Sequence, residues 1–227
     1  MITIKSHASS SSGNLYTLTS GNAVLLIECG LPLKKIQQAL NFKLSSVEGC
    51  ILTHEHMDHA KAALDIMSRG VDVYSSAGTF KALGISNHRA KRVEPLRWFQ
   101  VGAFHVLPFP TQHDAAQPYG YLITDGEDKI VFATDTYYME HRFTGATKIM
   151  IECNYAADLL PDDCPHAERI KRSHFELDRC KRWLKSCDLS KVTEIHLLHL
   201  SGGHSDEQRF INEIQAATGK PVYVCAE

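Results

Sequence analysis

The sequence predicts an α/β fold in which two sheets pack face to face and helices cover their outer faces. Three observations lead to this prediction. Apolar and β-branched runs recur along the 227 residues, separated by turn signals. Strands dominate the start of the chain, and strands alternate with amphipathic helices later. The order of elements forms two similar halves. Sheets and helices that each carry one apolar face bury it in such layers, and the length fits one domain over residues 1–227.

The first half is predicted to hold five strands and two helices. The strands span residues 2–5, 15–19, 24–28, 49–52 and 71–74, and the helices span residues 32–40 and 60–68. Ser20-Gly21-Asn22 is expected to form a hairpin turn. Pro32 suits the first turn of a helix, and the apolar residues that follow it recur with helical spacing. The serine run at 9–12 is expected to be a loop.

The second half begins with a series of strands that we expect to be mostly antiparallel. These strands span residues 98–101, 104–107, 119–124 and 130–133, and further strands follow at 148–153, 193–198 and 222–224. Asp125-Gly126 is a hairpin turn within the series. Helices are predicted at 175–187 and 206–217. We expect Ser205 to cap the second of these helices, with Gln208 in the capping-box position.

Composition and charge exclude several classes of protein. Hydrophobic residues make up 44% and charged residues 22%, as in ordinary globular domains. A net charge of −2 gives no global positive field that would draw the whole surface to nucleic acid or anionic lipid. The sequence contains no run of about 18 apolar residues, so no transmembrane helix is predicted, and we expect no signal peptide. Seven cysteines without CxxC pairs indicate reduced thiols, so we expect a cytoplasmic protein.

Thirteen histidines are the unusual feature of the composition, and several follow predicted strands. The segment Thr53-His54-Glu55-His56-Met57-Asp58-His59 joins a buried strand to a helix. His54 and His56 lie two residues apart on an extended segment, so they point the same way and can bind one cation. Asp58 and His59 lie at the turn into the helix and can bind a second. Imidazole and carboxylate ligands without a thiolate suit zinc, manganese or iron and indicate a catalytic metal site.

Further ligands are expected where later strands end, because two metal ions need about four more bonds. The candidates are His113 in Thr111-Gln112-His113-Asp114, Asp135 in Thr134-Asp135-Thr136, and His199 in Leu198-His199-Leu200. His204, five residues after His199, is an alternative ligand for the second metal.

Taken together, these motifs resemble the metallo-β-lactamase superfamily over nearly the whole chain, and within it the YycJ/WalJ-type group of exonuclease-like proteins. The resemblance is carried by Ser11-Ser12-Gly13-Asn14, residues 113–121, Thr134-Asp135-Thr136, Glu152-Cys153-Asn154, Arg169-Ile170, Ser173-His174 and His199-Leu200-Ser201. It implies a four-layer αββα sandwich with two mixed sheets between outer helices. The chain departs from the group where Phe175-Glu176-Leu177 follows His174 in place of Leu-Ser-Asn, and where Tyr137 stands in place of Gly.

The resemblance also implies a role for each site residue. His54, His56 and His113 would bind one metal ion, Asp58, His59 and His199 would bind the second, and Asp135 would bridge the two. His174 would lie beside the scissile phosphate and protonate or neutralise the leaving oxygen without binding metal. The expected catalytic residues are therefore His174, Asp58 and Asp135, and the expected substrate contacts are Ser12, Asn14, Asn154 and Arg169.

Three features favour a phosphodiester as the substrate. Asp135 as a bridge and His174 as an extra histidine resemble the nuclease branch of the superfamily. Basic residues around Arg169 precede His174 and can contact phosphates. The loop at 9–14 can offer backbone N–H groups to an anion. We therefore predict a phosphodiesterase, and specifically a DNA exonuclease, that uses hydroxide activated by two divalent ions. Zinc or manganese is expected, with iron or magnesium as alternatives.

Two other hypotheses compete with a nuclease. A small-molecule hydrolase of the same fold, such as a cyclic nucleotide phosphodiesterase, a thioesterase or a lactonase, fits the near-neutral charge and short loops. A non-enzymatic binding module is the third, although the complete ligand set argues against it. The fold alone cannot choose among these. The expected partner is nucleic acid, with DNA preferred to RNA, or a nucleotide, with no membrane. The oligomeric state is not predicted.

Overall fold

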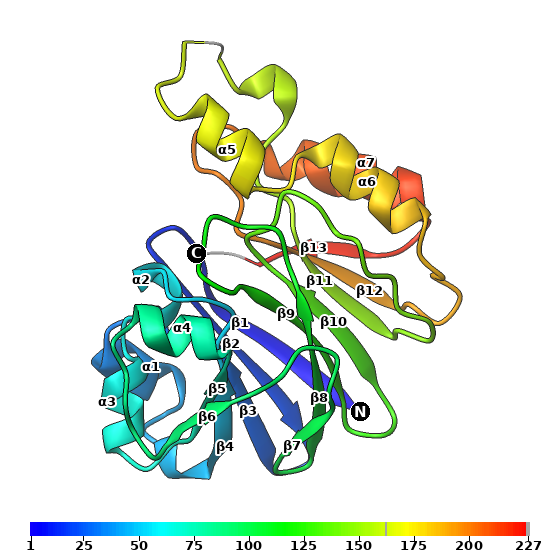
Figure 1. The fold of residues 1–227 in the computed structure, drawn as a ribbon. Coiled ribbons are helices and arrows are strands. Elements are labelled where there is room, and N and C mark those ends of the chain that lie inside the picture. Colours follow the sequence, from blue (N-terminus) through cyan, green and yellow to red (C-terminus); the bar gives the residue numbers. More distant parts are fainter. Residues whose placement is uncertain (162, 226–227) are drawn as a thin grey trace. The chain divides into compact units, whose positions relative to one another are not determined.

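The computed structural model describes residues 1–161 and 163–225, and these residues form two compact units (Figure 1). Unit 1 comprises Met1–Pro110 and Ala115–Glu127, and unit 2 comprises Thr111–Asp114 and Asp128–Cys225. Strands and helices are mixed in the whole chain, so the predicted α/β class with two mixed sheets is confirmed. None of the helices in the described residues has the length and apolarity to cross a membrane.

Unit 1 contains a mixed six-stranded sheet in the order β1-β2-β3-β4-β5-β6. Its elements are β1 (Ile2–Ser10), β2 (Gly13–Ser20), β3 (Ala23–Ile27), α1 (Leu33–Ala39), the 3-10 helix η1 (Leu44–Ser46), β4 (Val47–Ile51), α2 (Met57–Ala60), α3 (Ala63–Ser68), β5 (Val73–Ser75), α4 (Ala77–Ala82) and β6 (Ala90–Arg92). Strands β7 (Phe99–Val101), β8 (Phe104–Pro110) and β9 (Tyr119–Thr124) also belong to unit 1 but not to this sheet. The first three strands are antiparallel, and β3 to β6 are parallel.

Two tight hairpins begin the sheet of unit 1. Ser20 lies opposite Ala23, so Gly21 and Asn22 form the turn that the sequence predicts. Gly21 has a φ of 57°, which a glycine adopts without strain. The serine run at 9–12 was expected to be a loop, and this is wrong for Ser9 and Ser10. Both belong to β1 because Ser10 pairs with Gly13 across a two-residue turn.

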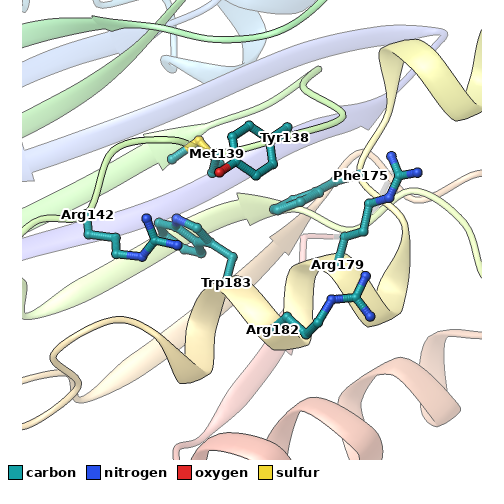
Figure 2. A pocket seen from close by; sticks show the side chains of 7 residues that line it. All are labelled: Tyr138, Met139, Arg142, Phe175, Arg179, Arg182 and Trp183. Atoms are coloured by element: carbon teal, nitrogen blue, oxygen red, sulfur yellow. The ribbon is translucent and has the colours of Figure 1, made fainter.

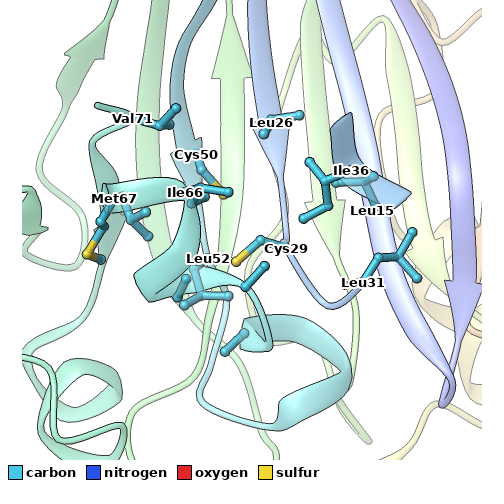
Figure 3. Close-up of a cluster of buried hydrophobic side chains, with 14 of the residues drawn as sticks. Leu15, Leu26, Cys29, Leu31, Ile36, Cys50, Leu52, Ile66, Met67 and Val71 are labelled. Carbon is cyan, nitrogen blue, oxygen red and sulfur yellow. The ribbon is translucent and has the colours of Figure 1, made fainter. Parts of the chain in front are cut away.

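The outer face of this sheet is covered by α1, α3 and α4 (Figure 1). Buried side chains from the sheet and helices form one apolar cluster, in which Leu26 and Cys50 of the strands meet Ile36 of α1 and Ile66 of α3 (Figure 3). On its other face, the sheet packs against β7 to β9. The hydroxyl of Tyr121 donates a hydrogen bond of 2.7 Å to the carbonyl of Leu52. Two packed layers of strands therefore hold the end of β4 in place.

Unit 2 contains four parallel strands in the order β10-β11-β12-β13. Its elements are β10 (Lys129–Ala133), β11 (Lys148–Glu152), the 3-10 helix η2 (Ala157–Leu159), α5 (Ala167–Ser173), α6 (Leu177–Lys185), β12 (Glu194–Leu198), α7 (Glu207–Thr218) and β13 (Val222–Val224). The carboxyl ends of parallel strands meet at one edge of a sheet. Asp135, Glu152 and His199 therefore come together from the ends of β10, β11 and β12.

Several predicted boundaries need correction. The single helix expected at 60–68 is two helices, because the N–H of Ala62 donates to the carbonyl of Cys29 and leaves the helical pattern. Ser205 does not cap α7. Its hydroxyl donates to the carbonyl of Ser201, and the Asp206 side chain accepts from the Arg209 N–H. The short elements α4, α5 and β6 were not predicted. All seven cysteines are free thiols, as expected.

Candidate metal centre

The histidine motif follows β4 directly and turns into α2 in unit 1. His54 is 1% exposed, and His56 is the N-terminal cap residue of α2. The Nε2 atom of His54 and the Nδ1 atom of His56 are 3.1 Å apart, with the rings nearly perpendicular. The two imidazoles therefore bring ring nitrogens close together, and their role as ligands of one cation stays a prediction. Glu55, between them, accepts a hydrogen bond from the Ala116 N–H and takes no part in the pair.

Asp58 and His59 form a second group of donor atoms on the first turn of α2. The Oδ2 atom of Asp58 lies 3.3 Å from Nε2 of His59. The other ring nitrogen, Nδ1, lies 3.3 Å from the carboxylate of Glu28, which is fully buried. A carboxylate beside Nδ1 favours the proton on that nitrogen, although the geometry is not that of a hydrogen bond. Nε2 is then the nitrogen that faces Asp58 and that could bind a metal ion.

Glu28 also positions the start of the motif. Its carboxylate accepts hydrogen bonds from the hydroxyl of Thr53 at 2.6 Å and from the Thr53 N–H at 3.3 Å. The hydroxyl of Thr53 lies 2.9 Å from Nδ1 of His54. Glu28 has a φ of 65°, in a region that non-glycine residues rarely adopt. The buried carboxylate of Glu28, on a residue with strained backbone angles, therefore contacts residues at both ends of the motif.

Two neighbours fix the position of α2 against the strands. The Asn14 side chain is fully buried, and its amide donates to the carbonyl of Asp58 at 3.2 Å and lies 3.2 Å from Nε2 of His59. Gly30 lies against the same turn. A Cβ at Gly30 would be 1.6 Å from the carbonyl oxygen of Asp58, so only glycine fits without moving α2.

In unit 2, His113 lies in a short segment that packs against the carboxyl end of β10. Its Nδ1–H donates to the carbonyl of Ser173 at 2.9 Å, and Nε2 lies 3.4 Å from Oδ2 of Asp135. The imidazole is fully buried. Burial lowers the pKa of His113 even though the Asp135 carboxylate acts in the opposite direction. The ring is therefore neutral at neutral pH, which is the form that binds metal ions.

Asp135 and His199 follow the ends of β10 and β12 with unusual backbone conformations. Their φ values are 47° and 53°, and few non-glycine residues adopt such angles. Their side chains are buried, and Oδ1 of Asp135 lies 3.3 Å from Nδ1 of His199. Donor atoms of Asp135, Glu152, His174 and His199 all lie within 4.8 Å of one another. Strain of this kind persists where packing enforces it, commonly at functional sites.

Glu152 is the centre of this group. Its Oε1 atom lies 2.6 Å from Nδ1 of His174 and 3.4 Å from Nδ1 of His199, and its Oε2 accepts the N–H groups of Thr136 and Phe175. Burial by itself would raise the pKa of Glu152, but His174 and its hydrogen bonds hold it below the ordinary value. The carboxylate is therefore ionised, so His174 carries a proton on Nδ1.

His174 is the C-terminal cap residue of α5, and its side chain is 12% exposed. Burial by itself would lower the pKa of His174, but the adjacent Glu152 carboxylate outweighs this and raises it. The charged imidazolium is thus favoured by the same carboxylate that orients the ring. With Nδ1 bonded to Glu152, Nε2 is the atom that can meet a substrate.

The other predicted site residues have different surroundings. Asn154 is buried and donates to the carbonyl of His199 at 2.7 Å, so it supports that strained turn. Arg169 is more than half exposed and pairs with Asp114 at 2.8 Å. Ser12 is exposed at the β1–β2 turn. Contacts of these residues with substrate stay a prediction. His204 bonds to the carbonyl of Leu159, so the structure places His199, not His204, beside Asp135.

Two acids that contact the candidate ligands were not predicted as site residues. Glu28 and Glu152 are acids at the ends of otherwise apolar strands, and both are fully buried. Acids are rarely buried unless they are paired. Their position at a strand end, beside a predicted ligand turn, is the signal that could have found them.

The donor set fits divalent metal ions. Unit 1 offers three imidazoles and a carboxylate between His54 and His59, and unit 2 offers His113, Asp135 and His199. Imidazole and carboxylate ligands are typical of zinc, manganese and iron sites, and His59, His113 and His199 each face a carboxylate or a carbonyl group as such ligands commonly do. No cysteine is among them.

Comparison with known proteins identifies the family. Residues 24–197 match the Beta-lactamase superfamily domain. The chain therefore belongs to the beta-lactamase superfamily. The crystal structure of the metallo-beta-lactamase fold protein YhfI from Bacillus subtilis shares the fold, with a TM-score of 0.77 over 97% of this chain and 95% of that one, at 19% identity.

Two curated relatives extend the comparison. Exodeoxyribonuclease WalJ of Streptococcus pneumoniae is 30% identical over 181 residues, which cover 73% of this chain and 66% of the relative. Exodeoxyribonuclease YycJ of Bacillus anthracis is 30% identical over 169 residues, which cover 67% of this chain and 63% of the relative. The chain thus spans slightly less than two thirds of the length of each.

Proposed function

We propose that this protein is a metal-dependent hydrolase that cleaves phosphodiester bonds, and specifically a DNA exonuclease. Two features support the proposal. The donor groups of both units have the chemistry of a two-metal hydrolase site, and the two relatives named above are called exodeoxyribonucleases. The single observation that carries the choice of a phosphodiester is the His174–Glu152 pair beside Asp135 and His199.

The seven predicted ligands are proposed to hold two divalent ions. His54, His56 and His113 would bind one ion, Asp58, His59 and His199 the other, and Asp135 both. When bound, two such ions supply a nucleophile from water at neutral pH and neutralise charge on the group under attack. Both ions are proposed to be zinc or both manganese, because imidazole and carboxylate donors suit either metal.

The chain's own residues would complete the reaction around these ions. Glu152 holds the His174 ring by Nδ1 and favours its protonated form, so Nε2 of His174 can donate a proton to the leaving oxygen of a phosphodiester. Glu28 and the Ser173 carbonyl hold His59 and His113 in the tautomer whose Nε2 can bind metal. A thioester or lactone also needs such ligands, but an added imidazolium suits the negative charge of a phosphate.

Two measurements test the proposal. The metal content of the purified chain should be two ions per molecule. The chain should degrade a labelled DNA duplex to mononucleotides with manganese or zinc. Activity on a cyclic nucleotide or a thioester, without DNA cleavage, would replace the nuclease with a small-molecule hydrolase. A chain with two metals and no activity on any ester would support a binding module instead.

A further inference from the structure

A cavity of about 260 Å³ lies in unit 2, between α6 and the segment after β10 (Figure 2). Its lining combines three arginines with three aromatic rings: Arg142, Arg179, Arg182, Tyr138, Phe175 and Trp183. Small-molecule sites typically have volumes of about 300–1,000 Å³. The cavity therefore has room for one small group or one unit of a polymer.

The helix α6 supplies one wall of this pocket. Arg179, Arg182 and Trp183 are spaced three and four residues apart, so they share one helix face. The indole of Trp183 is buried and donates to the carbonyl of His141 at 3.1 Å. This bond ties α6 to the opposite wall, near Arg142.

None of the three arginines forms an ion pair within 4 Å with a carboxylate of the described residues, although the charge of Arg182 helps to lower the pKa of Asp178. In contrast, Lys181, on the same helix, pairs with Asp178 and with Glu213 of α7. Arg142 uses two donor groups, on the hydroxyl of Ser186 and the carbonyl of Glu140, and Arg179 uses one, on the carbonyl of Lys171. A guanidinium has five N–H donors, so most donors around the pocket are available to an anion.

The aromatic rings add a second kind of contact. Tyr138 is 49% exposed, whereas Phe175 and Trp183 are buried. An exposed aromatic ring beside arginines that form no ion pair offers a stacking surface next to groups that can bind a phosphate. This combination is the chemistry with which proteins hold single-stranded nucleic acid.

Both walls of the pocket are attached to the buried carboxylate of Glu152. Its Oε2 accepts the N–H of Phe175, which lines the pocket and follows His174 directly. The same oxygen accepts the N–H of Thr136, whose hydroxyl donates to the carbonyl of Tyr138 at 2.7 Å. Tyr138 and Phe175, which line the pocket, are therefore close in sequence to Asp135 and His174, and Glu152 holds both segments.

We propose that this pocket binds a nucleoside monophosphate unit of the substrate strand. Its arginines hold the phosphate, and the ring of Tyr138 stacks on the base. The proposal rests on the phosphodiesterase function proposed above and goes beyond it, because it assigns strand recognition to residues outside the metal ligands. The pocket selects a nucleotide chain over a small ester, which has no group to fill it.

The test uses the full-length chain as purified, with its metals. Thymidine monophosphate binding is measured by calorimetry, and the KM for a labelled oligothymidylate is measured over a range of salt concentrations. The variants are Arg182→Gln, Arg179→Gln and Tyr138→Leu. Lys185→Gln is the matched control, because it removes one charge from α6 on the side of Glu213 and not in the pocket.

Each arginine variant should weaken thymidine monophosphate about tenfold. It should raise the KM for the oligonucleotide, and it should reduce the slope of log affinity against log salt by about 0.7. Tyr138→Leu should weaken thymidine monophosphate about 5- to 150-fold and leave inorganic phosphate binding unchanged. Lys185→Gln should behave as the wild type in thymidine monophosphate binding, in KM and in turnover of bis(p-nitrophenyl) phosphate.

Three results separate the pocket from the proposed function. If the pocket variants match Lys185→Gln in both binding and KM, the pocket proposal is overturned even when the chain cleaves DNA. If thymidine monophosphate binding falls but KM does not change, the pocket takes free nucleotide and not the strand, which also overturns it. If the chain binds thymidine monophosphate through these residues but cleaves no DNA, the pocket is supported as a nucleotide site and the nuclease proposal fails.

Discussion

Glu152→Gln is the substitution that should separate the proposed chemistry from metal binding. The amide has the size of the carboxylate but no negative charge. Glu152 is fully buried, and its two oxygens receive two backbone N–H groups and face the Nδ1 atoms of His174 and His199. A glutamine has only one acceptor oxygen, so if that oxygen serves the N–H groups, its NH2 must face the imidazoles.

The size of the effect follows from these contacts. The short bond to His174, 2.6 Å long, is charge-assisted, and such bonds contribute about 1.5–3 kcal/mol. We therefore expect the free energy of unfolding to fall by about that amount. The catalytic rate should also fall, because the negative charge of Glu152 that favours the protonated form of His174 is removed. Loss of a general acid typically lowers the rate by about 10²–10⁴-fold, and we expect a decrease in kcat of about 10²-fold.

The assay is kcat and KM on labelled DNA, together with metal content and denaturant unfolding. Glu176→Gln is the matched control, because Glu176 is also a buried acid that accepts two N–H groups, at the start of α6, but it faces no imidazole. The control should keep the wild-type kcat. A Glu152→Gln enzyme with two metals and a kcat within threefold of the wild type would refute the proposed role of this carboxylate.

Four further predictions follow from single contacts. Asp58→Ala should lose metal and activity together in elemental analysis and DNA cleavage, and full metal content would argue against its role as a ligand. His174→Ala should keep both ions but lose about 10²–10⁴-fold in kcat, so unchanged turnover would remove His174 from the mechanism. Gly30→Ala should lower metal content and cost about 1–3 kcal/mol or more in denaturant unfolding, because its Cβ would lie 1.6 Å from the Asp58 carbonyl. Hydrogen bonds from Arg209 and Lys181 hold the pKa of Glu213 below its ordinary value. The stability that Glu213→Gln removes at pH 7 should therefore vanish as the pH falls below about 4, and a constant difference between pH 7 and pH 3 would contradict this.

The sequence predicted the fold class because the periodic apolar runs of the strands are local signals. Tyr119–Thr124 and Val222–Val224 have the predicted bounds. Elements with a small apolar face gave no such signal. The helix Ala167–Ser173 was missed for this reason, since its seven residues bury only Ala167 and Ser173.

The candidate ligands could be predicted because metal donors are few in kind and stand at strand ends. The geometry within each unit agrees with that pattern, from the His54–His56 pair to Asp135 beside His199. The supporting acids could not be predicted in the same way. The role of Glu152 depends on which imidazoles fold against it, and this is a long-range contact that no local spacing encodes.

The arginine pocket also depends on long-range contacts that the sequence does not reveal. A cluster of basic residues can be read from the sequence, but ion pairing within the cluster cannot. Only the folded structure distinguishes Lys181, which is neutralised by two acids, from Arg182, which lines an open cavity one residue later.

We propose that seven side chains hold two divalent ions. Anomalous diffraction from crystals of the purified protein, recorded at the absorption edge of its metal, tests this claim most directly. We expect two peaks per chain, both beside the carboxylate of Asp135. One should also be bonded to His54, His56 and His113, and the other to Asp58, His59 and His199. A single peak, or peaks bonded to other residues, would contradict it.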